Sequence, residues 1–202
     1  MLKELFESCF YKTFPTKKNV IVNLTEKSYS GTFSLLDAEA CRDCRLQCDP
    51  IPSNRKQLMV LTAKNVNTIK VDSIFKPVKE DYGRMCDYLM DDGNKFALIE
   101  MTCATQKYVE SKRVTCIGQL YNTLTNLRTC GPVRQHIEKA AEREAIFSWK
   151  GTFDSADLFD PVEKSMTAMT DIGDDVYSPH NVSAFESGFL YREIRYPDVW
   201  VW

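Results

Sequence analysis

Two carboxylates, Asp87 and Glu100, lie in apolar runs that a short polar segment separates. The runs cover residues 85–90 and 95–100, and the separator 91–94 is a strong hairpin signal because its Gly and Asn tolerate positive φ angles. An antiparallel pair of strands would bring the two carboxylates close together. Such a pair suits a hard cation such as Mg²⁺, which would polarise a phosphate and generate hydroxide near neutral pH. The pattern predicts a phosphodiesterase site.

Three cysteines, Cys41, Cys44 and Cys48, form a second candidate site in a polar stretch rich in proline. A Cys-x₂-Cys pair with a third thiol four residues on supplies most of a tetrahedral shell for structural Zn²⁺. The competing interpretation is three free or partly buried thiols. A Cys/His hydrolase is disfavoured because the chain offers only 2 histidines as bases. Candidates for a fourth zinc ligand are Cys9, His136 and His180.

The elements that must position these residues follow from periodicity. Residues 57–62, 67–72, 85–90, 95–100 and 144–149 have strand character, and apolar residues recur at three- and four-residue steps from 106 to 127, which predicts a helix. Further helices are expected over 2–10 and 133–141. A strand is expected over 19–24, a turn over 28–31, and more strands over 189–196 and 199–202. Alternating strands and helices indicate an α/β domain.

The order of these elements resembles the core of the PD-(D/E)XK nuclease superfamily, which runs helix, three strands, helix, strand. The matching segments are Cys86-Asp87-Tyr88 and Phe96-Ala-Leu-Ile-Glu100-Met101-Thr102, and Gln119 on the following helix is similar to a glutamine that some branches carry. The resemblance covers roughly residues 55–150. It implies a restriction-endonuclease-like fold, with a mixed central sheet flanked by helices, in which Asp87 and Glu100 hold Mg²⁺.

The chain departs from that family at Thr102, where the resemblance implies a catalytic lysine. A neutral hydroxyl cannot supply a point positive charge, and losing one such group costs a factor of about 10²–10³ in rate. Lys107 or Lys112 on the next helix is a candidate replacement. The alternative is that both lysines are solvated and that the two carboxylates are ordinary polar strand ends. Gln119 is equally consistent with a plain surface residue.

Charge is unevenly distributed along the chain, although the formal net charge is only -2. Basic residues outnumber acidic ones between 105 and 150, whereas acidic residues dominate 151–202. The first segment therefore suits a polyanion, and the second suits solubility or a protein partner. An aromatic C-terminal end offers either a base-stacking platform or a buried or interface strand, and the second is favoured. Its residues are Tyr191, Tyr196, Trp200 and Trp202.

One domain is expected for 202 residues, divided into an N-terminal cysteine-containing segment (1–54), a nuclease-like core (55–150) and a C-terminal β extension (151–202). No apolar run is long enough to span a membrane and no signal peptide is evident, so a cytoplasmic location is expected. The favoured function is a non-catalytic or weakly active subunit of a nucleic-acid-processing or antiviral defence assembly. It would bind nucleic acid, a partner protein or a second copy of itself. The alternative is an active Mg²⁺-dependent DNA endonuclease with a relocated lysine.

Overall fold

A computed structural model describes residues 2–22, 24–36, 56–104, 106–151, 183–185 and 188–202. Two of the expected features fall outside these ranges. They are the cysteine cluster (Cys41, Cys44 and Cys48) with the possible ligand His180, and most of the acidic segment 151–202. Zinc binding by the cluster therefore stays a prediction.

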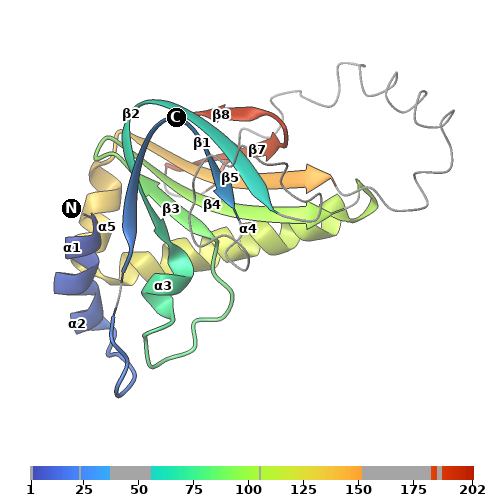
Figure 1. Ribbon diagram of the computed structural model, residues 1–202. Coiled ribbons are helices and arrows are strands. Elements are labelled where there is room, and N and C mark those ends of the chain that lie inside the picture. The colour runs from blue at the N-terminus through green and yellow to red at the C-terminus, as the bar shows by residue number, and fades with distance from the viewer. Residues whose placement is uncertain (1, 23, 37–55, 105, 152–182, 186–187) are drawn as a thin grey trace, which may run out of the picture.

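The protein is an α/β fold built on one open, mixed sheet (Figure 1). The strand order is β1-β2-β3-β4-β5-β7-β6, and β8 pairs with β2. Strands β1 to β4 are antiparallel to one another, whereas β5 is parallel to β4 and β7 is parallel to β5. The strands are β1 (Glu26–Leu36), β2 (Gln57–Lys70), β3 (Tyr88–Asp91), β4 (Lys95–Ala104), β5 (Glu142–Gly151), β6 (Ser183–Ala184), β7 (Leu190–Arg195) and β8 (Val199–Val201).

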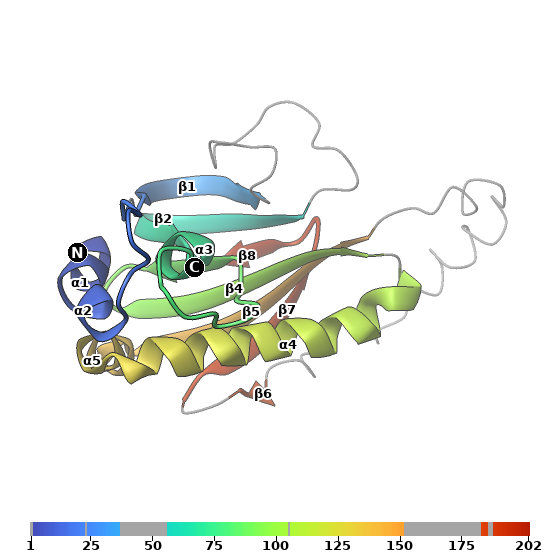
Figure 2. The same cartoon turned by 90° about the horizontal axis from the view of Figure 1, so that it is seen from below.

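One long helix, α4 (Gln106–Thr129), lies along one face of the sheet and makes the crossover from β4 to β5 (Figure 2). Its apolar stripe packs on the inward residues of β4 and β5 to form the larger core. The N-terminal helical turns and α5 close the end of this core. The remaining helical elements are α1 (Leu2–Leu5), η1 (Phe6–Phe10), α2 (Tyr11–Thr13), α3 (Val71–Phe75) and α5 (Gly131–Lys139).

The sheet curls, so that β1 and the start of β2 stand over the face opposite to α4 (Figure 2). A second apolar cluster fills this concave side, with contributions from β1, β2, β3, β4, β5 and β8. A hydrogen bond between two strands that are not neighbours stabilises the curl: Ser148 Oγ in β5 donates to Gln57 O in β2 at 3.2 Å. The first residues of β2 therefore lie beside the ends of β4 and β5.

The periodic elements are confirmed, including the 91–94 hairpin and the long helix, except that residues 71 and 72 belong to α3 and β3 begins only at Tyr88. Two local expectations are wrong. The described residues of the range 19–24, which are 19–22 and 24, do not form a strand, since Asn19 takes a left-handed φ of 64 and these residues have no strand partner in the described structure. Residues 28–31 are not a turn but part of β1, where Gly31 with φ 75 sits at a register shift. A β-bulge uses the same conformational freedom as a turn, and pairing with β2 decides between them.

The aromatic C-terminal end belongs to the fold and not to an open stacking platform. Tyr191 and Trp200 are buried, and Trp200 Nε1 donates to Glu144 Oε2 at 3.1 Å. Trp202 Nε1 donates to Asp92 Oδ2 at 2.9 Å. The favoured expectation of a buried aromatic strand is confirmed for Tyr191 and Trp200, whereas Trp202 is partly exposed and lies just after β8. None of the helices in the described ranges qualifies as a membrane span.

Candidate functional site

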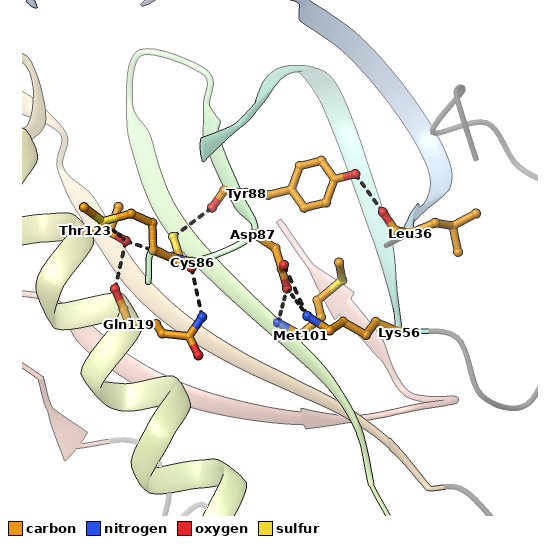
Figure 3. Close-up of polar contacts among 9 residues, drawn as sticks. Leu36, Lys56, Cys86, Asp87, Tyr88, Met101, Gln119 and Thr123 are labelled. Atoms are coloured by element: carbon orange, nitrogen blue, oxygen red, sulfur yellow. Dashed lines mark hydrogen bonds and ion pairs between the residues drawn. The ribbon is translucent and has the colours of Figure 1, made fainter. Parts of the chain in front are cut away.

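Asp87 is the residue immediately before β3, one step outside the strand in which it was expected (Figure 3). Its backbone is held on both sides, because Asp87 N donates to Ile99 O at 3.0 Å and Val71 N donates to Asp87 O at 3.1 Å. Its side chain accepts from Met101 N at 2.8 Å through Oδ2. The Asp87 carboxylate therefore takes the place of a backbone partner for Met101, which fixes it beside β4.

Glu100 lies within β4, directly next to the position of Asp87. The strand continues to Ala104, so Glu100 is not at a strand end as expected. Only 3% of Glu100 is exposed, and its Oε2 atom has no hydrogen-bond partner among the described residues. Burial, together with the neighbouring Asp87 charge, raises the pKa of Glu100 to about 8. A buried carboxylate oxygen without a donor is a site that a cation would satisfy.

Lys56 brings an ammonium group to this pair, and sequence analysis did not anticipate it. Its Nζ lies 3.4 Å from both carboxylate oxygens of Asp87, and both side chains are half-buried (Figure 3). Lys56 immediately precedes β2, which the curl of the sheet carries across to the ends of β4 and β5. The only local signal is a lysine at the start of a strand, and such lysines are usually solvated.

Thr102 stands at the position of the expected lysine, and Lys107 and Lys112 are its candidate replacements. In the described structure none of the three brings an ammonium group to Asp87 or Glu100. Thr102 is buried in β4 and carries a neutral hydroxyl. Lys112 is on the exposed side of α4, and no hydrogen bond or ion pair joins it to Asp87 or Glu100 in the described structure. Lys107 lies in the first turn of α4, and its side chain is outside the described part. Among the residues that the structure describes, Lys56 is thus the one that places an ammonium at Asp87.

Gln119 holds the segment before Asp87 and also hydrogen-bonds the Glu100 side chain, which opposes the rise in the pKa of Glu100. It belongs to a row of polar side chains on α4 that hold the irregular segment 82–86. Gln119 Nε2 donates to Met85 O at 2.9 Å, and Asn122 Nδ2 donates to Tyr82 O at 2.6 Å. Thr123 Oγ1, which is fully buried, accepts from Cys86 N at 2.9 Å (Figure 3). These bonds anchor the stretch of chain that ends at Asp87.

His136 and the buried thiols of the described part serve the packing and hydrogen bonding of the fold. His136 Nε2 lies 3.1 Å from Asp91 Oδ1, a hydrogen bond that raises the pKa of His136. Burial raises the pKa of Cys86 far above its usual value and that of Cys116 to about 12, so neither is an activated thiolate. No group of three or more metal-type side chains occurs among the described residues. Asp87 and Glu100 therefore remain a two-carboxylate site.

Several basic residues between 105 and 150 are used inside the fold. Arg113 Nη2 donates to Glu193 Oε2 at 3.0 Å, and its Nη1 contacts Glu110. Lys150 is buried, with Nζ 3.5 Å from Gln57 Oε1. This segment is consequently less available to a polyanion than its sequence suggested.

Comparisons of the chain with protein-family models, curated proteins and solved structures gave no match. The chemistry of the site is therefore the basis for assigning a function.

Proposed function

We propose that the protein is a divalent-metal-dependent phosphodiester hydrolase that acts on nucleic acid. The observation that carries this proposal is the pair formed by half-buried Asp87 and buried Glu100, in which Glu100 Oε2 has no partner among the described residues. A structural carboxylate at 3% exposure would normally be satisfied by a donor from the protein. A cation-binding role accounts for the cost of burying Glu100 beside a second carboxylate.

The donor set fits a hard cation such as Mg²⁺ or Mn²⁺. Both groups are carboxylates, and Met101 N holds Asp87 by Oδ2, while Lys56 Nζ lies near both Asp87 oxygens. When bound, the cation would polarise a phosphodiester and lower the pKa of a water molecule. The protein's own part is to hold the two acids side by side, Asp87 immediately before β3 and Glu100 within β4.

The arrangement of elements supports the restriction-endonuclease-like interpretation. N-terminal helical turns precede an antiparallel meander of β2, β3 and β4, and α4 then leads to β5, which is parallel to β4. This is the order implied by the resemblance, with Asp87 at the second of these strands and Glu100 in the third. Nucleic acid as the substrate class comes from that resemblance.

Two measurements test the function. Mn²⁺ binding, followed by electron paramagnetic resonance, is expected for the wild type and lost in Asp87→Asn and Glu100→Gln. Cleavage of plasmid, single-stranded DNA and RNA with Mg²⁺ or Mn²⁺ is expected to fall by about 10²-fold or more in the same variants. Glu110→Gln, which alters an exposed carboxylate on α4, serves as the matched control and should leave both unchanged.

A wild type that neither binds Mn²⁺ nor cuts any of these substrates would overturn the proposal. The fold would then belong to a non-catalytic subunit, for which capture of nucleic acid or a protein partner is the next measurement.

A further inference from the structure

We propose that Lys56 is a catalytic residue, supplying at the scissile phosphate the positive charge that Thr102 cannot provide. The inference rests on the proposed function and deepens it. Lys56, just before β2, would take the catalytic role that the resemblance implies for a lysine at position 102 in β4. What must be conserved for the chemistry is the position of an ammonium in space, and a long, flexible lysine can reach that position from a different strand.

The first argument is geometric. Lys56 Nζ is 3.4 Å from Asp87 Oδ1 and 3.4 Å from Oδ2, so it faces the carboxylate symmetrically and does not lie along one edge. The ammonium therefore lies at the Asp87 carboxylate, where it could also reach a phosphate held by a cation at this site.

The second argument is that the other described cations near the core are already used elsewhere. Lys150 lies on the concave face with Gln57, and Lys70 Nζ is 5.6 Å from the centre of the Tyr88 ring. Arg113 is held by Glu193. Among the described residues, Lys56 is the cation whose side chain contacts the Asp87 carboxylate, and 28% of that side chain is exposed.

The reaction step balances without any oxidant or reductant. A water oxygen forms a bond to phosphorus while the bond from phosphorus to the leaving oxygen breaks. The water loses one proton to solvent, and the leaving oxygen gains one from solvent. Lys56 stays protonated throughout and stabilises the negative charge that develops on the phosphate oxygens, a role that is electrostatic and preorganised.

Lys56→Met tests this through two readouts that are expected to move in opposite directions. Cleavage should fall by about 10²–10³-fold, because a preorganised charge is lost. Mn²⁺ affinity in the absence of substrate should rise by about threefold to tenfold, because a positive charge next to the cation site is removed. Lys64→Met, which removes an exposed lysine from β2, is the matched control and should change neither readout.

A second variant separates a catalytic role from a merely structural one. Adding Thr102→Lys to Lys56→Met returns an ammonium from β4 and should restore cleavage by about tenfold or more over Lys56→Met. A fall in Mn²⁺ affinity in Lys56→Met would show that Lys56 only holds Asp87 in place, and this would overturn the inference. Unchanged cleavage in Lys56→Met would do the same while leaving the metal-dependent function intact.

Thr102→Lys in the wild-type background completes the design. Little gain is expected, since Lys56 already fills the role. A large gain in cleavage there would mean that the role is vacant in the natural chain, which contradicts the inference. Absence of Mn²⁺ binding in the wild type would instead count against the proposed function itself.

Discussion

At the scale of single residues, the site is dominated by the cost of keeping Glu100 inside the protein. The side chain is nearly inaccessible, it lies beside Asp87, and one of its oxygens has no described donor. A raised pKa means that the folded state favours the protonated acid. Folding stability of the metal-free protein therefore decreases as pH rises from the unfolded pKa, near 4.5, through the folded value of about 8.

Glu100→Gln removes this cost and is expected to stabilise the metal-free protein. At pH 5 the wild-type acid is protonated in the fold, so the two proteins should melt at similar temperatures. At pH 9 the variant should melt several degrees higher, at about 2–4 °C per kcal/mol for a chain of this size. Differential scanning fluorimetry between pH 5 and 9 measures the difference. A constant or shrinking difference would contradict the assigned pKa shift.

The two acids could be predicted from sequence, whereas the lysine could not. Asp87 and Glu100 flank a hairpin whose turn is encoded locally, so their proximity follows from strand register alone. Lys56 lies 31 residues before Asp87 and meets it only because the sheet curls. Curling depends on packing of the whole concave face, which no local pattern encodes.

At the scale of elements, α4 and the segment 82–86 form one mechanical unit. The segment has no regular structure, so its backbone groups need partners, and α4 supplies them through Gln119, Asn122 and Thr123. Helix α4 therefore does more than cover one face of the sheet, because it also fixes the segment that precedes Asp87. The periodicity of α4 was evident in the sequence, but which of its polar residues face inward was not, because Thr123 interrupts the apolar stripe.

Thr123→Val keeps the shape of the side chain and removes the acceptor for Cys86 N. A buried amide left without a partner costs about 1–3 kcal/mol, and the unfolding free energy should fall by that amount. Mn²⁺ affinity should weaken as well, since the segment before Asp87 loses an anchor. Urea denaturation measures the first effect and metal titration the second. Thr123→Ser retains the hydroxyl and should preserve metal binding; equal losses in both variants would rule out the hydrogen bond as the cause.

At the scale of the whole molecule, a charged cluster around Glu144 connects the C-terminal strands to the centre of the sheet. Glu144 in β5 is buried and lies 3.3 Å from Lys95 Nζ. It also accepts from Arg192 Nε at 3.0 Å and from Trp200 Nε1 at 3.1 Å. Because β4, β5, β7 and β8 all contribute, this single carboxylate links strands from both halves of the sheet.

Glu144→Gln should be among the most destabilising single substitutions in the chain. Removing one partner of a buried ion pair typically costs about 3–5 kcal/mol, and here buried Lys95 would keep only the exposed carboxylate of Glu142. Urea denaturation gives the loss. Glu142→Gln alters a neighbouring, exposed partner of Lys95 and should cost about 1 kcal/mol or less. Similar losses for the two substitutions would show that burial of Glu144 does not matter.

The hydrogen bond from Met101 N to the carboxylate of Asp87 gives the site an intrinsic spectroscopic label. Most amides of a β-strand report on the neighbouring strand, but this one reports on the charge and position of a single acidic side chain. In a ¹⁵N-resolved NMR spectrum the chemical shift of the Met101 amide would change on protonation of Asp87, on cation binding and on substitution of Lys56, and each effect can be measured separately. Hydrogen exchange of the same amide with solvent would measure how often the hydrogen bond between Met101 N and Asp87 breaks.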